Sequence, residues 1–349
     1  MRRHTFACVI NKIIHFFCGL ITYFGFLLLP LNNRLSHKTP SRPAVTAGTV
    51  RPKKHLGQHF LTDSATAGRI AGGMTGFGAY SQLIEVGAGT GILTQHLLKL
   101  PYHLWLSEVD ERSIAHLVHK MGIAENLIVG DFLRLDLHGL LSIRSDHVDP
   151  SQTVQHSWGQ SVVQPSPLQP VAVEGQRADA VNSIPQIGVV GNFPYHISSQ
   201  ILFKVLEQRL MIPEMCGMFQ REVAQRICAP PGNKTYGILS VLTQAYYRTE
   251  YLFTVNEGVF NPPPKVKSGV IRIQRLPEPA SCDESLLRRL VKAAFNQRRK
   301  RLGNALKTLL PPDFPDTHRL MDLRAEQLSV PMFVALTQEF ALCAPPVSR

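Results

Sequence analysis

The sequence lacks the cysteine patterns of a metal site or a disulfide scaffold. Its six cysteines include no CxxC pair and no cysteine–histidine spacing that would hold zinc. Scattered cysteines in a chain of 349 residues are therefore expected to be reduced thiols of a cytosolic protein. A hydrophobic share of 44% also excludes a disordered or collagen-like chain and indicates a soluble globular protein.

Acidic residues are absent from positions 1–50, which carry six basic ones. Residues 13–29 are nearly all apolar, at the short limit for a membrane span and longer than a usual signal-peptide core. No methionine occurs between Met1 and Met74. Three interpretations of this leader stay open: an anchor or uncleaved signal, an organellar presequence, or sequence upstream of the true start. The predicted localisation is cytoplasmic, or membrane-tethered or organellar if the leader is native.

The net charge of +12 is unevenly distributed along the chain. Residues 51–260 hold 16 basic and 17 acidic residues, whereas residues 261–349 hold 15 basic and 8 acidic ones. Two basic ends thus flank a neutral middle, and a polyanionic partner is expected at the C-terminal end.

A glycine-rich loop follows the first predicted strand. Residues 81–86 (SQLIEV) favour a buried strand, residues 87–91 (GAGTG) a loop, and residues 92–100 an amphipathic helix. This unit opens a doubly wound α/β sheet, in which Gly87 and Gly89 let the backbone approach a ligand. The loop lacks the GxGxxG of dinucleotide enzymes and the GK[ST] of P-loops, which disfavours hydride and phosphoryl transfer.

Acidic residues end the next two predicted strands. Residues 103–110 end in Glu108 and Asp110, and an acid there can accept hydrogen bonds from ribose hydroxyls. Residues 126–130 lead to Asp131 and Phe132, which can accept from an adenine amine and cover its ring. Each carboxylate alone could be a solvated strand end, but together they favour an adenosine ligand without a pyrophosphate. S-adenosylmethionine is the predicted cofactor.

The strand at residues 187–192 delivers the tetrapeptide Asn192-Phe193-Pro194-Tyr195. The Asn192 amide oxygen and the Phe193 carbonyl can accept both hydrogens of an exocyclic amine, which stabilises the charge that develops as its nitrogen attacks a methyl group. Pro194 stiffens the turn, and Tyr195 can stack on a flipped-out base. These four residues are the predicted catalytic set.

Nine segments together resemble the KsgA family of small-subunit ribosomal RNA adenine N6,N6-dimethyltransferases. They are KKHLGQHFL (53–61), IEVGAGTGILT (84–94), SEVD (107–110), GDF (130–132), GNFPYHIS (191–198), FQREVAQRI (219–227), KTYGILSVLTQ (234–244), FNPPPKVKSGVIR (260–272) and AFNQRRKRLGNAL (294–306). The resemblance implies a Rossmann-like methyltransferase sheet with a small C-terminal helical domain. It also implies dimethylation of two adjacent adenosines near the 3′ end of 16S rRNA, with a role in small-subunit biogenesis.

By this resemblance the cofactor contacts fall on a set drawn from several strand ends. They are His59, Leu61, Gly87, Gly89, Glu108, Asp131 and Asn192. His59 and Phe193 depart from the family pattern, which often has Asn and Leu there. The Phe193 contact is expected through its backbone, and His59 could donate through its ring or merely fill space.

The expected domains are the leader at 1–50, the methyltransferase domain at 51–260 and a helical RNA-binding domain at 261–349. A flexible insertion is predicted at about 142–185, where Gln, Ser, Val and Pro are common. Trp158 within it allows a docking role as the alternative to an unstructured loop. A helix is predicted at 286–306. RNA phosphate contacts are expected from a basic cluster: Lys265, Lys267, Arg298, Arg299, Lys300 and Arg301.

The expected partners are small-subunit rRNA and the immature 30S subunit, bound by a monomer without a metal. Three alternative functions share parts of the pattern: a large-subunit resistance methyltransferase, a DNA adenine methyltransferase, and an RNA-binding assembly or transcription factor without catalysis. The KTYGILSVLTQ and AFNQRRKRLGNAL segments favour the small-subunit group, and the intact Asn192, Pro194 and Tyr195 favour an enzyme.

Overall fold

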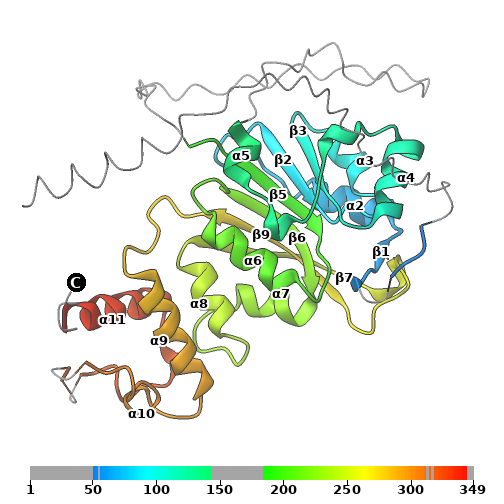
Figure 1. Ribbon diagram of the computed structural model, residues 1–349. Coiled ribbons are helices and arrows are strands. Elements are labelled where there is room, and N and C mark those ends of the chain that lie inside the picture. The colour runs from blue at the N-terminus through cyan, green and yellow to red at the C-terminus, as the bar shows by residue number, and fades with distance from the viewer. Residues whose placement is uncertain (1–49, 54–55, 143–183, 312–313, 316–317, 344–349) are drawn as a thin grey trace, which may run out of the picture. The chain divides into compact units, whose positions relative to one another are not determined.

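The computed structural model describes residues 50–53, 56–142, 184–311, 314–315 and 318–343 (Figure 1). Residues 1–49 of the leader predicted at 1–50 and nearly all of the insertion predicted at 142–185, Trp158 included, lie outside the described residues.

The described part contains a seven-stranded sheet in the order β4-β3-β2-β5-β6-β9-β7 and a two-stranded sheet of β1 and β8. The strands are β1 (Phe60–Leu61), β2 (Gln82–Val86), β3 (His103–Ser107), β4 (Ile128–Val129), β5 (Ile187–Asn192), β6 (Glu214–Gln220), β7 (Tyr247–Val255), β8 (Phe260–Asn261) and β9 (Ser268–Arg275). Strands β2 to β6 pair in parallel, and β9 pairs antiparallel with β6 and β7.

The strand order reverses between β2 and β5, which are hydrogen-bonded neighbours. From β2 the chain moves outward through β3 to β4, and from β5 it moves the other way through β6. At such a reversal the loops after the two central strands diverge and leave a crevice at the carboxyl ends. Residues 187–191 are all buried, as expected for a strand covered on both faces.

Helices cover both faces of the sheet (Figure 1). The α-helices are α2 (Ser64–Ala71), α3 (Thr94–Leu97), α4 (Glu111–Met121), α5 (Leu137–Ser142), α6 (Ser198–Glu207), α7 (Arg221–Cys228), α8 (Ile238–Gln244), α9 (Glu284–Asn296), α10 (Leu302–Ala305) and α11 (Val330–Cys343). Four 3-10 turns, η2 (Glu125–Leu127), η3 (Phe132–Arg134), η6 (Glu257–Val259) and η7 (Ala325–Gln327), complete the described elements.

Two hydrophobic cores follow from the alternation along β2. Leu83 faces a core with α2, α3 and α4, whereas Ile84 and Val86 face a core with α5, α6 and α8. The second core continues without interruption into α9 and α11 through Leu290 and Phe333. The C-terminal helices are therefore packed on the same core as one face of the sheet.

Two predicted helices are wrong in extent. The helix predicted at 92–100 is reduced to α3: after Leu98 the amides of Lys99 and Leu100 donate to carbonyls three residues back, and Pro101 disfavours helical backbone at Leu100. The helix predicted at 286–306 is two helices, α9 and α10, separated by a turn at residues 297–301. That turn is held by tertiary contacts: residues 301 and 324 form a β-bridge, and the Leu302 amide donates to the Leu323 carbonyl.

The domain division at residue 261 stays a prediction. Residues 268–275, however, form β9 inside the main sheet, between β6 and β7, so the helical part begins with α9.

Candidate active site

A pocket of about 250 Å³ lies at the carboxyl ends of β2, β3, β4 and β5. The loop after each of these strands contributes to its wall, and residues 56–60, which lead into β1, complete it. The lining includes six of the seven predicted cofactor residues and all four predicted catalytic ones. Leu61 is the exception, because its side chain is only 3% exposed and packs into the core beside α2.

The glycine loop after β2 requires backbone that other residues rarely adopt. Gly87 and Gly89 have φ values of +79° and +55°. A Cβ atom on Gly89 would also lie 2.9 Å from the Phe60 ring. Both ends of the loop are tied together, because Thr94 Oγ1 at the start of α3 donates to Glu85 Oε2 at 2.6 Å. Burial raises the pKa of Glu85 to about 8, against a weaker lowering by this hydrogen bond.

Glu108 is held rigidly by backbone amides. Its Oε2 accepts from Gly89 N at 2.8 Å, and its Oε1 accepts from the amides of Val109 and Asp110 at 2.7 and 2.8 Å. The side chain is 6% exposed, and burial raises its pKa although these amides favour the ionised form. Oε2 keeps a lone pair for one more donor. The carboxylate is thus a fixed acceptor at the pocket wall.

Asp131 and Phe132 form the next part of the wall, after β4. The Asp131 Oδ1 accepts from the Leu133 amide at 3.0 Å and caps the turn η3. Phe132 is 2% exposed and presents an apolar surface to the pocket beside it. An acceptor next to an apolar ring is the pair expected for an adenine.

Asn192 is the last residue of β5 and Phe193 follows it; the Asn192 side chain lies at the pocket, whereas the Phe193 side chain is buried in the core. The Asn192 Nδ2 donates to the His59 carbonyl at 3.1 Å, which fixes the amide and makes its Oδ1 the outward acceptor. The Phe193 side chain is 1% exposed and packs edge-on against Phe219 at 5.2 Å. A Cβ on Gly217 would come within 2.1 Å of that ring. Phe193 therefore faces the core, and only its backbone is left for the pocket.

Tyr195 is held from two sides. Its hydroxyl lies 2.5 Å from Ser268 Oγ at the start of β9, and its ring stacks on His59 with 5.6 Å between centroids. Burial raises the pKa of Tyr195, so the phenol stays neutral. The His59 ring is itself fixed, since its Nδ1 lies 2.8 Å from the Pro262 carbonyl oxygen. The His59 ring thus connects Tyr195 with the residue after β8, and its contact with a cofactor stays a prediction.

Sequence reasoning missed several residues at this pocket. Gln58 and His196 line it, and Ser268, which pairs with Gln220 at the carboxyl end of β6, contacts the Tyr195 hydroxyl. Gln58 lies within the KKHLGQHFL segment, which was a usable signal. Ser268 likewise lies within the FNPPPKVKSGVIR segment, but its contact with Tyr195 depends on β9 lying beside β6, which the local sequence does not show.

The basic residues predicted to bind RNA differ in their surroundings. Arg298 is committed to the protein: its guanidinium donates to the carbonyls of Asn233 and Lys234 and pairs with Glu326 at 3.4 Å. Arg301 pairs with Asp322 at 2.9 Å on the surface. The remaining four are Lys265, Arg299 and Lys300, which are exposed, and Lys267, which is half-buried.

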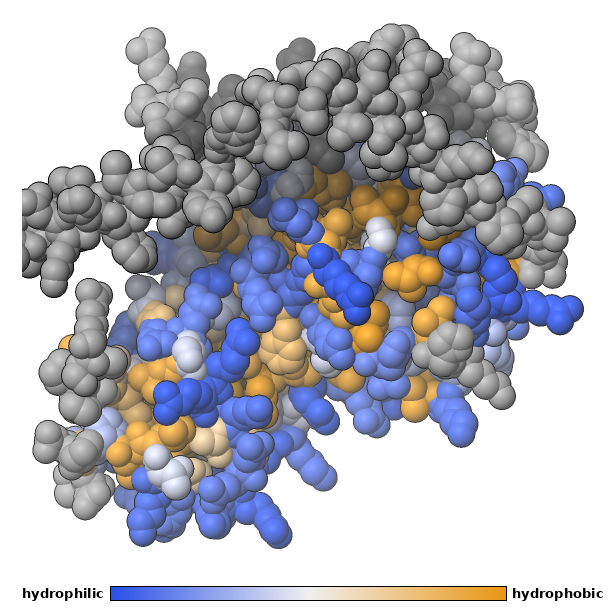
Figure 2. All heavy atoms as spheres, viewed as in Figure 1, coloured by the Kyte–Doolittle hydropathy of each residue, from blue (hydrophilic) through white to orange (hydrophobic). Residues whose placement is uncertain are grey.

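Hydrophilic side chains cover much of the face shown in Figure 2, with hydrophobic ones visible between them. That colouring does not separate cations from other polar groups, so RNA contact by the basic cluster stays a prediction. Within the described ranges, no helix is long and apolar enough to cross a membrane. The same residues contain no group of three or more histidine, cysteine, aspartate or glutamate side chains that could hold a metal ion.

Comparison with known proteins identifies the family of this chain. Residues 50–341 match the family described as ribosomal RNA adenine dimethylase. Ribosomal RNA small subunit methyltransferase A of Cytophaga hutchinsonii is 44% identical over 295 residues, 82% of this chain and 96% of the relative. The protein of that name from Bacteroides fragilis is 44% identical over 307 residues, 86% of this chain and 97% of the relative.

Two solved structures share the fold at 20% identity. A dimethyladenosine transferase from Plasmodium falciparum has a TM-score of 0.59, covering 82% of this chain and 98% of that one. The 23S rRNA methyltransferase ErmE has a TM-score of 0.51, covering 80% and 99%. The predicted α/β methyltransferase fold and the predicted family are both confirmed. The chain belongs to the ribosomal RNA adenine dimethylase family.

Proposed function

We propose that the pocket binds S-adenosylmethionine and that the protein dimethylates the N6 amines of two adjacent adenosines near the 3′ end of small-subunit rRNA. The observation that carries this proposal is the orientation of Asn192. Its Nδ2 is bound to the His59 carbonyl, which directs Oδ1 as an acceptor into a pocket that also holds Glu108 and Asp131.

The residues present fit this cofactor. Glu108 offers a fixed carboxylate oxygen to a ribose hydroxyl, and Asp131 with Phe132 offers an acceptor and an apolar face to an adenine. Gly87 and Gly89 permit close approach of the ligand to the backbone. When bound, S-adenosylmethionine supplies an electrophilic methyl group on a positively charged sulfur.

The chain's own residues position the target amine. The Asn192 Oδ1 and the Phe193 carbonyl accept its two hydrogens, which leaves the nitrogen lone pair free to attack. Charge that develops on the nitrogen is stabilised by these two oxygens, and the proton can leave after the methyl group has transferred. Alignment of this kind can lower a barrier by up to roughly 7 to 11 kcal/mol.

Tyr195 is suited to hold the base itself. Its ring is fixed by Ser268 and His59 before any substrate arrives, so little conformational freedom is lost when a flipped-out adenine stacks on it. The proposed partners are small-subunit rRNA and the immature 30S subunit. Lys265, Lys267, Arg299 and Lys300 are proposed to contact phosphates, while RNA shape selects the site.

The deciding experiment offers the purified protein labelled S-adenosylmethionine with either immature small subunits, naked small-subunit rRNA or large-subunit rRNA. We expect label on two adjacent adenosines of the small-subunit RNA. Label confined to large-subunit RNA would replace the proposed substrate with that of the ErmE-like enzymes. Asn192→Ala should abolish transfer while leaving RNA binding intact, which separates lost chemistry from lost substrate. The protein is proposed to act as a cytoplasmic monomer.

A further inference from the structure

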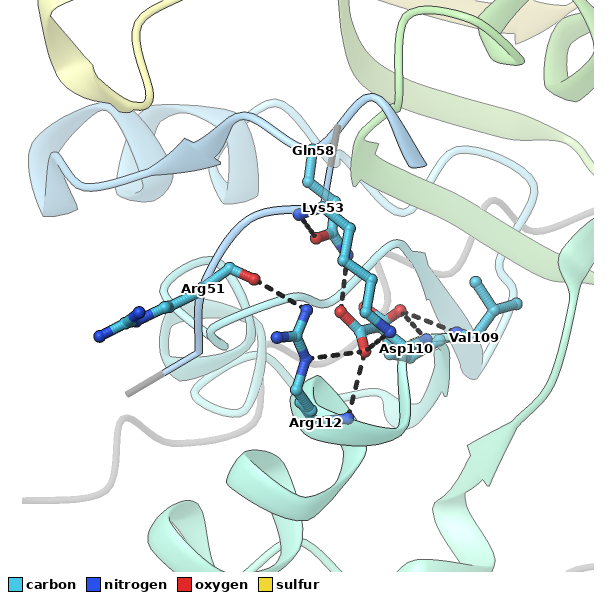
Figure 3. Close-up of polar contacts among 7 residues, drawn as sticks. Arg51, Lys53, Gln58, Val109, Asp110 and Arg112 are labelled. Carbon is cyan, nitrogen blue, oxygen red and sulfur yellow. Dashed lines mark hydrogen bonds and ion pairs between the residues drawn. The ribbon is translucent and has the colours of Figure 1, made fainter. Parts of the chain in front are cut away.

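The Asp110 carboxylate connects two segments that lie far apart in the sequence. It is completely buried, and Figure 3 shows Lys53 and Gln58 reaching it from the segment before β1. Lys53 Nζ lies 2.8 Å from Oδ1, and Gln58 Nε2 donates to Oδ2 at 3.1 Å. We call residues 51–53 and 56–61 the N-terminal strap. Its residues 56–60 form one wall of the pocket.

The strap is also fastened to itself and to α4 around this carboxylate. The Gln58 Oε1 accepts from the Lys53 backbone amide at 2.8 Å, so one side chain joins both ends of the turn. Arg112 Nη2 donates to the Arg51 carbonyl at 3.1 Å, while its Nε lies 3.6 Å from Asp110 (Figure 3). Burial alone would raise the pKa of Asp110, but the hydrogen bonds from Lys53 and Gln58 outweigh it and lower that pKa.

These contacts exceed what capping a helix requires. Asp110 caps α4 by accepting from the Arg112 amide at 3.2 Å, and that duty needs a single oxygen. Asp283 performs the same duty for α9 by accepting from the Leu286 amide at 2.9 Å. A buried carboxylate costs free energy unless it is paired, and the pairing cation here, Lys53, comes from a segment 57 positions away and not from α4.

The other end of the strap reaches the catalytic tetrapeptide. The His59 carbonyl receives the Asn192 Nδ2, and Phe60 and Leu61 pair with β8. On the Asp110 side, the Asp110 amide donates to Glu108 Oε1 at 2.8 Å. The N-terminal strap thus connects the turn that follows Glu108, the proposed ribose contact, with the side chain of Asn192, the proposed acceptor of the target amine.

We propose that Asp110 is a positioning residue that clamps the N-terminal strap over the cofactor pocket and, through His59, fixes the Asn192 amide. This inference rests on the proposed function for its effect on the reaction. Holding the strap in place before the cofactor arrives removes an ordering cost from binding, and holding Asn192 removes one from the chemical step.

Asp110→Ser tests the clamp while sparing the helix. Serine is as good a helix cap as aspartate but is too short and uncharged to hold Lys53 and Gln58. We expect the affinity for S-adenosylmethionine, measured by calorimetry without RNA, to fall about tenfold or more, and kcat to fall as well. Amide hydrogen exchange in the strap should quicken in the cofactor-free protein, with α4 exchange unchanged.

Two further variants make the test specific. Lys53→Met should give a smaller loss of cofactor affinity, and adding it to Asp110→Ser should cost little more, because the two residues share one interaction. Asp283→Ser is the matched control: it changes the same residue type at the cap of α9 and should leave cofactor affinity as in the wild type.

Wild-type cofactor affinity and strap exchange in a folded Asp110→Ser variant would overturn the proposal. So would fully additive effects of the Lys53 and Asp110 substitutions. The exchange measurement needs no cofactor, so it tests the clamp even if the wild-type protein bound no S-adenosylmethionine. That last result would refute the proposed function instead.

Discussion

Replacing Glu85 with glutamine should make the stability of this protein less sensitive to pH. Glu85 lies at the end of β2 with 1% of its surface exposed, and Thr94 Oγ1 donates to it. Its pKa rises from the ordinary 4.5 to about 8, because burial disfavours the ionised form. Glutamine retains an oxygen for Thr94 and cannot ionise.

The sign and size of the effect follow from proton linkage. Between pH 4.5 and about 8, Glu85 keeps its proton in the folded protein and has lost it in the unfolded chain. The free energy of unfolding therefore decreases as the pH rises through this range. At about 1.36 kcal/mol per pH unit, Glu85 removes roughly 3 kcal/mol between pH 4.5 and pH 7. Glu85→Gln should not show this loss.

Urea unfolding of both proteins between about pH 4.5 and pH 7.5 measures the difference. The variant should gain on the wild type as the pH rises, by roughly 3.5 kcal/mol over this range. If one amide hydrogen of the new glutamine has no partner, the free energy of unfolding falls by the same amount at every pH, and its dependence on pH is unaffected. Glu278→Gln, at an exposed position, controls for the loss of one carboxylate. A difference that stays constant with pH, or shrinks as the pH rises, would refute a protonated Glu85.

Three other outcomes are expected. Gly217→Ala should lower the free energy of unfolding by about 1–3 kcal/mol in urea titrations, because the new Cβ would meet the Phe193 ring. Adding Phe193→Leu, which removes that ring, should restore part of the lost free energy. Arg298→Ala should lower the melting temperature, since the Arg298 guanidinium donates to backbone carbonyls of the protein. Arg299→Ala, at an exposed position, should leave the melting temperature unchanged. It should instead reduce by about one the slope of the logarithm of the RNA-binding constant against the logarithm of the salt concentration. Tyr195→Phe should slow methyl transfer about fivefold, because it removes the hydrogen bond to Ser268, worth roughly 1 kcal/mol. An unchanged rate would show that this hydrogen bond does not position the ring.

The sheet and the strand-end residues could be predicted because local pattern determines them. Residues 82–86 and 187–192 are mostly apolar and almost entirely buried, as is typical of strands covered on both faces. Parallel strands bring their carboxyl ends to one edge, so Glu108, Asp131 and Asn192 had to meet there once the topology was doubly wound. The structure places all three around one pocket, and their roles as ligand contacts stay predictions.

The parts that could not be predicted depend on contacts between distant segments. A run such as Gln297–Arg301 is compatible with a helix, but Leu302 and Arg301 pair with residues 323–324 instead and break it. RNA contact by Arg298 stays a prediction, but its charge in the sequence does not show its partners in the protein, which are two carbonyls 64 and 65 positions away and Glu326. Local propensity carries no information about either arrangement.

The geometry of the site depends on several distant segments and not on the tetrapeptide 192–195 alone. Asn192 is oriented by His59, Tyr195 by Ser268, and His59 by Pro262, so each group takes its direction from a segment at least 70 positions away. The antiparallel pair of β1 and β8 brings two of those segments together. Changes that separate β1 from β8 should therefore disturb the Asn192 amide before they disturb the glycine loop, whose ends are tied locally by Glu85 and Thr94.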